Sequence, residues 1–171
     1  MARRYKDTEG TIYFGSYSDF APYQPFSNFA ETAFIWEGER YESLERAYQA
    51  QKTDVPKEKL DIRFAKSSVA AKRLGTKCKM RKDWDVIKRR VMKELVRAKF
   101  YQNDELKKLL IETKGKTLVE EAPWDEYYGN GRDGTGQNEL GKILMEVREE
   151  LINRFIPTKE NKDGSTLDKR K

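Results

Sequence analysis

The chain of 171 residues contains no histidine. Histidine is the general base of Ser-His-Asp and Cys-His sites and a common metal ligand, so its absence excludes those mechanisms and any histidine-ligated metal. Chemistry in this chain has to use carboxylates, lysine, tyrosine or the backbone. The single cysteine, Cys78, has no partner for an intramolecular disulfide, which agrees with a reducing cytoplasm.

Long apolar runs are also missing. No segment approaches the roughly 20 apolar residues that a membrane helix needs. The N-terminal MARRYKDTEG lacks the apolar centre and the small-residue cleavage site of a secretory signal. We therefore expect a soluble, cytoplasmic protein with no membrane partner. The formal net charge of +6 favours an anionic partner, either nucleic acid or a phosphorylated small molecule.

The length predicts one domain, and no linker or repeat divides the chain. We expect a flexible N-terminal arm at 1–11, a domain at 12–156 and a disordered polar tail at 157–171. Short segments rich in aromatics and separated by Gly, Pro, Ser and Asn predict a few strands near the N-terminus, and helical periodicity prevails after residue 43. The predicted fold class is α+β, predominantly helical.

The predicted elements follow from hydrophobic period and capping residues. Helices are expected at 43–52, 56–65, 68–75 (ending at its glycine), 83–102, 103–113 and 138–155, with Ser43, Asp83, Asn103 and Asn138 as N-caps. Strands are expected in IYFGSYSDF, TAFIWEG, ERY and GKTLVEEAP. Between the last strand and the last helix lies the glycine-rich loop APWDEYYGNGRDGTGQ.

The segment YESLERAYQAQK at 41–52 places a polar row on one helical face. At 100° per residue, Glu45 and Lys52 almost eclipse each other, and Tyr48 and Gln49 flank them. One interpretation is a solvated face, in which Ser43 caps the helix and Glu45 meets its dipole. The other is a binding site, favoured by the 11 of 20 aromatic residues between Tyr13 and Tyr48 that border the row.

Other segments have two interpretations as well. PFSNF is either an ordinary Ser-Asn turn or a loop that presents two hydrogen-bonding groups. Trp84 is either a core residue or a stacking platform, and the basic residues of 82–99 are either a solvated face or a phosphate-binding flank. The glycine-rich loop precedes a helix N-terminus that can receive an anion, but it carries neither GxGxxG nor GK[ST].

These motifs, taken in order, resemble the NADAR (NAD- and ADP-ribose-associated) domain family with its YbiA-like N-glycosidases. The resemblance runs from about residue 12 to 155. Its pieces are PFSNF, Y-x-S-x-E-x-x-Y-Q-x-x-K at 41–52, AKRLG at 71–75, LVE at 118–120, D-x-x-Y-G-x-G from Asp125, and G-x-N-x-LG-x-x-LM-x-x-R from Gly136.

The resemblance implies a hydrolase that cleaves the N-glycosidic bond between a ribose and a base-like group. One branch acts on phosphorylated early intermediates of riboflavin biosynthesis, the ribosylaminopyrimidine 5′-phosphates, and another removes ADP-ribose from a nucleobase such as guanine in DNA. An oxocarbenium-like ribosyl cation needs a carboxylate near the anomeric carbon and a proton source for the departing nitrogen. No metal and no cofactor are required. Nucleic acid would enter only as a modified substrate.

Residue by residue, the resemblance assigns the two catalytic carboxylates to Glu45 and Asp125, without deciding which is acid and which is base. The residues expected to bind substrate are Ser27, Asn28, Tyr48, Lys52, Trp84, Tyr128 and Asn138. Two positions depart from the family pattern, Arg46 where histidine is usual and Tyr128 where tryptophan is usual. They bear on the identity of the leaving group. A non-catalytic module that binds ADP-ribose or nucleic acid is the alternative from another class.

Overall fold

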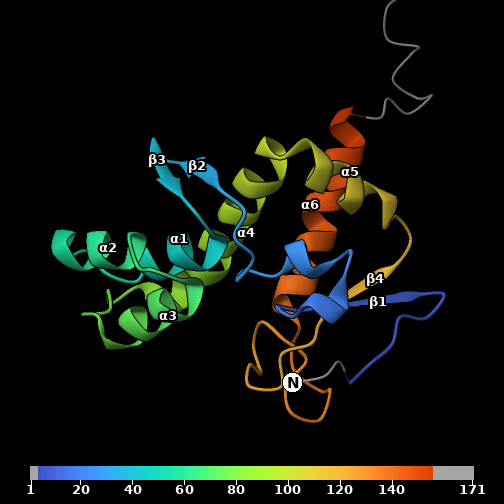
Figure 1. The fold of residues 1–171 in the computed structure, drawn as a ribbon, viewed down its shortest axis with the longest axis horizontal. Helices are drawn as coiled ribbons and strands as arrows, with labels where there is room; N and C mark the ends of the chain where they lie inside the picture. Colours follow the sequence, from blue (N-terminus) through green and yellow to red (C-terminus); the bar gives the residue numbers. More distant parts are fainter. Residues whose placement is uncertain (1–3, 156–171) are drawn as a thin grey trace, which may run out of the picture.

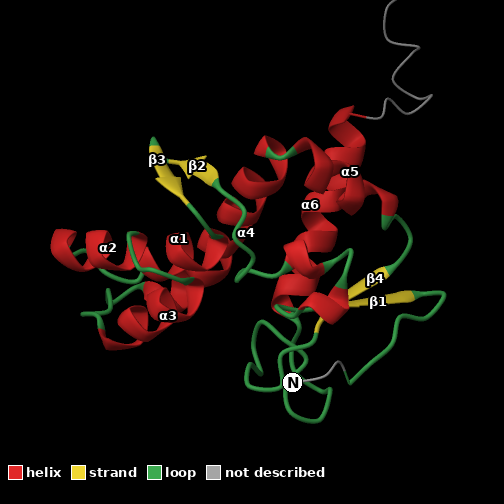
Figure 2. Cartoon of the chain, viewed as in Figure 1, coloured by secondary structure: helices red, strands yellow, loops and turns green. Residues whose placement is uncertain are grey.

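The computed structural model of the protein describes residues 4–155 (Figures 1 and 2). Helices dominate this range and the strands are short, so the predicted α+β, mainly helical single domain is confirmed. The tail predicted at 157–171 lies outside the described residues.

In chain order the elements are β1 (Thr11–Phe14), the 3-10 turns η1 (Ser18–Phe20) and η2 (Gln24–Phe26), β2 (Phe34–Trp36), β3 (Glu39–Tyr41), α1 (Leu44–Ala50), α2 (Pro56–Arg63), α3 (Ser68–Lys77), α4 (Trp84–Gln102), α5 (Asp104–Glu112), β4 (Thr117–Glu120) and α6 (Glu139–Phe155).

Helix α4 lies between two groups of elements (Figure 1). Helices α1, α2 and α3 gather on one side of it, with the β2–β3 hairpin, and β1, β4 and α6 lie on the other. The apolar stripe of α6, formed by Leu140, Ile143, Leu144, Val147 and Leu151, is fully buried, and α4 contributes Trp84, Val91 and Leu95 to the same core. Burial of these two stripes against each other fixes α4 as the wall between the two groups.

Three basic residues of α4, namely Arg89, Lys93 and Arg97, pair with acids of α6. The guanidinium of Arg89 lies 2.7 Å from Glu139 and 2.6 Å from Glu146. The ammonium of Lys93 lies 2.8 Å from Glu146 and 3.1 Å from Glu150. This flank therefore joins two helices, and much of its charge is already neutralised within the protein.

The two-stranded sheet of β1 and β4 joins segments that are about a hundred residues apart. The strands are parallel, with Phe14 opposite Glu120. Because the carboxyl ends of parallel strands lie at one edge, the loop that begins at Gly15 and the loop that begins at Glu121 emerge together. The strand expected in GKTLVEEAP is thereby confirmed as β4, and it carries the glycine-rich loop to the edge where β1 ends.

Several predicted helix ends need correction. Helix α3 does not stop at Gly75 but continues to Lys77, because Gly75 serves close packing: a side chain there would collide with the side chain of Gln49. Asp83 and Asn103 precede their helices without capping them through their side chains. The Asp83 carboxylate pairs instead with Arg81 at 2.6 Å. The Asn103 amide turns back and donates to a carbonyl in the last turn of α4 at 2.7 Å.

Residues 4–11, expected to be a flexible arm, contact the loop that follows β4. The backbone N–H groups of Arg4 and Tyr5 donate to the two carboxylate oxygens of Glu121 at 2.6 and 3.1 Å. The Arg4 guanidinium also donates to the carbonyl of Arg132 at 2.6 Å. This segment therefore ties down the start and the middle of the glycine-rich loop. Within residues 4–155, none of the helices has the length and apolarity required to cross a bilayer.

Candidate active site

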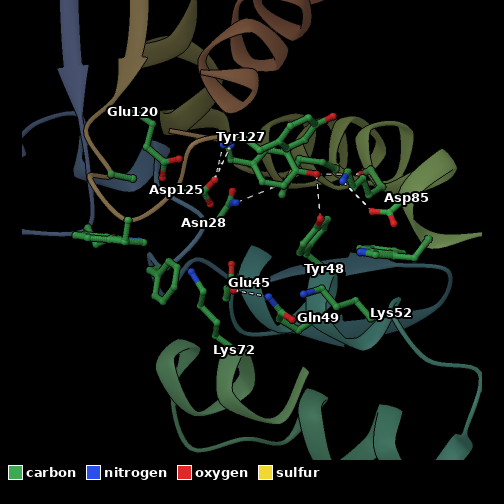
Figure 3. A pocket seen from close by; sticks show the side chains of 18 of the residues that line it. Asn28, Glu45, Tyr48, Gln49, Lys52, Lys72, Asp85, Glu120, Asp125 and Tyr127 are labelled. Carbon is green, nitrogen blue, oxygen red and sulfur yellow. Dashed lines mark hydrogen bonds and ion pairs between the residues drawn. The ribbon is translucent and has the colours of Figure 1, made fainter. Parts of the chain in front are cut away.

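One cavity of about 400 Å³ lies where the two groups of elements meet (Figure 3). Its lining combines residues of α1, α3 and α4 with residues of β4 and of the loops that follow β1 and β4. Ligand sites typically measure roughly 300–1,000 Å³, so this volume suits a small molecule. The predicted site residues that line it are Asn28, Glu45, Tyr48, Lys52, Trp84, Asp125 and Tyr128.

The residues of the polar row of α1 share one face, as the helical spacing predicted, and that face lines the cavity rather than open solvent. Glu45, Tyr48, Gln49 and Lys52 all line it. Ser43 caps the helix, accepting the backbone N–H of the third residue after it at 3.3 Å. The helix proper ends at residue 50, and the backbone N–H of Lys52 donates to the carbonyl of Gln49 at 3.2 Å. This last tight turn keeps the ammonium on the same side as the carboxylate.

Glu45 is a buried carboxyl group in the floor of the cavity, only 4% exposed. Burial raises the pKa of Glu45, while the hydrogen bond from Gln49 and the charges of Lys72 and Lys52 oppose the rise. The Gln49 amide donates to one carboxylate oxygen at 2.8 Å. The backbone N–H of Glu45 donates to the carbonyl of Asn28 at 2.9 Å, which locks the PFSNF loop to the helix start.

Asp125 approaches the cavity from the opposite side, on the glycine-rich loop (Figure 3). Its Oδ1 accepts the backbone N–H groups of Tyr127 at 3.0 Å and Tyr128 at 2.7 Å, which is an Asx turn. This turn explains the local sequence, because an aspartate two residues before paired tyrosines bends the chain and aims both rings. Oδ1 thus shapes the loop, and Oδ2 has no hydrogen-bond partner among residues 4–155 and is available to the cavity.

An aromatic wall lines the cavity beside the two carboxylates. The ring of Tyr48 packs on Trp84, with centroids 5.0 Å apart, and meets Tyr128 edge-on at 5.5 Å. The Tyr128 hydroxyl lies 3.0 Å from the Tyr48 hydroxyl and 3.2 Å from the carbonyl of Lys88. Burial raises the pKa values of both tyrosines, so both rings stay neutral hydrogen-bonding groups at physiological pH.

Three lysines line the same cavity, namely Lys52, Lys72 and Lys88. Lys88 is paired with Asp85 at 2.9 Å. Lys52 and Lys72 form no ion pair within the described range and lie instead over aromatic rings, Lys72 at 5.4 Å from the centroid of Phe29. Burial lowers the pKa of Lys52. Two unpaired cations at one cavity favour an anionic ligand.

Two buried amide oxygens lack a hydrogen-bond donor in the part of the chain that the structure describes. They are Asn28 Oδ1 and Gln49 Oε1. Both residues line the cavity, and the Asn28 amide nitrogen is held only by a weak contact of 3.6 Å to the sulfur of Met92. Because an unsatisfied buried acceptor is unfavourable, these oxygens favour a ligand with hydroxyl or amino donors.

Ser27 and Asn138, also expected at the substrate, do not line the cavity. The Ser27 hydroxyl lies 3.1 Å from that of Ser16 and accepts the backbone N–H of Phe29 at 3.2 Å, so it shapes the loop that presents Asn28. The Asn138 side chain accepts from the backbone N–H of Glu120 and donates to the carbonyl of Leu118, both at 2.9 Å. It staples the end of the glycine-rich loop to β4. The sequence alone could not distinguish Ser27 and Asn138, which support the loops, from nearby residues that line the cavity.

Arg46, one of the two departures from the family pattern, points away from the cavity. Its guanidinium donates to Glu31 at 2.5 Å and to the carbonyl of Ala65 at 2.9 Å. It therefore connects α1 to the segments before β2 and after α2. Tyr128, the other departure, lies in the cavity wall.

Sequence reasoning missed Lys72 and Glu120 in the lining. Glu120 is 7% exposed, and its pKa is raised to about 8 by burial and by the charges of Asp125 and Glu45. One signal was available in the sequence. Strand periodicity places Glu120 on the same face as Leu118, which is buried, and a charged residue on a core face is unusual.

Known proteins are similar to this chain in sequence and in fold. The NADAR domain family matches residues 13–152. N-glycosidase YbiA of Escherichia coli (strain K12) is 40% identical over 137 residues, which cover 79% of this chain and 86% of that protein. The NMR structure of E. coli YbiA superposes with a TM-score of 0.78 at 36% identity, covering 91% of this chain and 94% of that one.

A riboflavin biosynthesis protein of Vibrio vulnificus (strain YJ016) is 39% identical over 127 residues. The match covers 73% of this chain and 35% of that protein, so there the shared domain is part of a longer chain. The family match spans most of the present chain, including the described cavity residues from Asn28 to Tyr128. The chain belongs to the NADAR domain family.

Proposed function

We propose that the protein is an N-glycosidase that hydrolyses the bond between a ribose and a nitrogen base in a phosphorylated substrate. The observation that carries the proposal is the cavity itself. It sets the buried carboxyl group of Glu45 and the half-buried one of Asp125 near two lysines that have no ion pair within residues 4–155, and it adds an aromatic wall. Ribosyl cation, phosphate and planar base each have a complementary group there. The names of the relatives YbiA and the Vibrio riboflavin biosynthesis protein agree with this chemistry.

In the proposed reaction, departure of the base leaves positive charge on the anomeric carbon and ring oxygen. Glu45 is the carboxylate that stabilises this charge and takes a proton from the attacking water. Burial raises its pKa, which makes the carboxylate more basic, and the Gln49 amide fixes its orientation. Asp125, whose Oδ2 is left to the cavity by the Asx turn, assists from the opposite face.

The remaining lining residues bind the substrate in this proposal. Lys52 and Lys72 neutralise the phosphate, and Trp84 and Tyr128 flank the planar leaving group. Asn28 accepts from a ribose hydroxyl or a base amino group, because its Oδ1 lacks a donor among residues 4–155. The substrate class that fits is a ribosylaminopyrimidine 5′-phosphate, an intermediate of riboflavin biosynthesis.

The test is release of free base from two substrates, a ribosylaminopyrimidine 5′-phosphate and ADP-ribosylated guanine in DNA. Wild type is compared with Glu45→Gln, which keeps the shape and deletes the charge, and with Glu42→Gln, an exposed control three residues earlier. We expect cleavage of the pyrimidine substrate and a loss of 10²-fold or more, to order of magnitude, in Glu45→Gln alone. Cleavage of the guanine substrate alone would move the protein to the ADP-ribosyl branch. Binding of both without cleavage of either would make it a binding module.

A further inference from the structure

Glu120 brings a third carboxyl group to the cavity, beside Glu45 and Asp125 (Figure 3). Its backbone is fixed at the end of β4. The backbone N–H of Glu120 donates to the Asn138 side chain at 2.9 Å. Its carbonyl accepts the N–H groups of Ala122 and Asn130 at 3.1 and 2.9 Å. The carboxyl group is therefore aimed into the cavity by a rigid backbone.

The carboxyl group of Glu120 has neither a hydrogen bond nor an ion pair with any residue that the structure describes. Its neighbour Glu121 makes the contrast clear. Glu121 also lines the cavity, but both of its oxygens accept backbone N–H groups of Arg4 and Tyr5. Glu120 has no comparable structural task, yet burying an unpaired carboxyl group is unfavourable for stability. Such a group is a candidate for chemistry.

The charges around Glu120 favour its protonated form. Asp125 faces it from the glycine-rich loop and Glu45 from α1, and both raise its pKa, while Lys72 on α3 lowers it. Burial makes the largest contribution, and together these effects raise the pKa of Glu120 to about 8. At neutral pH the side chain is therefore mostly a carboxylic acid, which is a proton donor.

We propose that Glu120 is the general acid that protonates the departing nitrogen in the reaction proposed above. As the C–N bond breaks, the Glu120 carboxylic acid gives its proton to the leaving base. Water forms the new C–O bond at the anomeric carbon and gives a proton to Glu45. Proton exchange with solvent then returns Glu120 to the acid and Glu45 to the carboxylate, so the sum is substrate plus water giving free base plus ribose phosphate.

The surroundings of the three carboxyl groups differ, and each therefore suits a different role. Glu45 is hydrogen-bonded by Gln49 and faces two lysines, which favours its use as the anionic partner. One carboxylate oxygen of Asp125 accepts the two backbone N–H groups of the Asx turn. Glu120 is the member of the three whose carboxyl group is free of hydrogen bonds within residues 4–155 and whose charge is opposed by both others. The proposal rests on the proposed function.

The experiment compares two leaving groups in wild type, Glu120→Gln, Glu120→Asp and the exposed control Glu112→Gln. One substrate is the ribosylaminopyrimidine 5′-phosphate, whose nitrogen needs a proton to depart. The other is a ribosyl 5′-phosphate with a nitrophenolate leaving group, which needs none. We expect Glu120→Gln to lose about 10²–10⁴-fold on the first substrate and less than about tenfold on the second. Glu120→Asp should recover part of the activity, and Glu112→Gln should match wild type.

The pH profile gives a second readout on the aminopyrimidine substrate. In wild type, kcat/KM should fall as the pH rises through about 8, and Glu120→Gln should lack this alkaline limb. If Glu120→Gln lost equal activity on both substrates, or kept the alkaline fall in kcat/KM of wild type, the assignment would be overturned and the proposed function would stay intact.

Failure of the proposed function is distinguishable from failure of this inference, because wild type itself would then cleave neither substrate. In that event an infrared difference spectrum of wild type minus Glu120→Gln at pH 7 still decides the chemistry of the group. A protonated-carboxyl band in wild type supports Glu120 as a proton donor. A spectrum showing only carboxylate at that position overturns it.

Discussion

Replacing Glu120 by glutamine should change how the stability of the fold depends on pH. Glutamine keeps the size of the side chain but cannot ionise. Below about pH 4.5, the ordinary value for glutamate, Glu120 is protonated in both the folded and the unfolded chain. Between that pH and about 8 the folded protein keeps a proton that the unfolded chain has lost, so the stability of wild type falls as the pH rises.

The magnitude follows from the two pKa values. Each pH unit in this window lowers the free energy of unfolding by about 1.4 kcal/mol. From the ordinary value of 4.5 to about 8, the total is at most about 5 kcal/mol. Above pH 8 both states are ionised and the contribution no longer changes. The glutamine variant lacks this pH-dependent loss, so its free energy of unfolding should rise relative to that of wild type throughout the window.

Urea unfolding of both proteins at pH 4.5, 6, 7, 8 and 9 measures the effect. The useful quantity is the difference in free energy of unfolding, variant minus wild type, since titrating groups that do not interact with Glu120 cancel in it. We expect this difference to rise with pH and to level off above about 8. A difference that stays constant from pH 4.5 to 9 would refute the reasoning, because it would mean that Glu120 titrates alike in folded and unfolded chains.

Three further changes test other contacts. Gly75→Ala should destabilise the protein by about 1–3 kcal/mol and lower kcat, because the new methyl group collides with Gln49, the partner of Glu45; thermal unfolding and rate measurements check this. Lys99 is buried with its pKa lowered to about 7, so wild type should gain stability from about pH 7 to 10.5, and Lys99→Met should lack that gain in urea unfolding. Asn138→Ala removes two hydrogen bonds to β4 and should cost about 2 kcal/mol or more; a loss of only a few tenths would show that the staple is dispensable.

Features that depend on nearby residues could be predicted from the sequence. The polar row of α1 is the clearest case, since helical geometry alone decides that Glu45, Tyr48 and Gln49 share a face. The cap at Ser43 and the apolar stripes of α4 and α6 have the same local origin. The roles of these residues in catalysis and binding stay predictions.

Choices between neighbouring residues could not be made in this way. Within PFSNF, Asn28 reaches the cavity and Ser27 supports the loop. Asp83 and Asn103 had the right residue type for caps, but Arg81 and the end of α4 offered stronger partners. Gly75 looked like a helix stop because its real function, close approach to Gln49, involves a residue on another helix.

The sequence by itself determined the fold class, the helical faces and the supply of carboxylates and lysines, because these depend on residue type and on spacing within one element. Only the tertiary structure decided that Glu120 joins Glu45 and Asp125. That meeting requires β1 to pair with β4 and α4 to hold the two groups of elements apart. The unusual pKa of Glu120 has the same origin, since desolvation and the field of two distant carboxylates arise only when remote segments pack together.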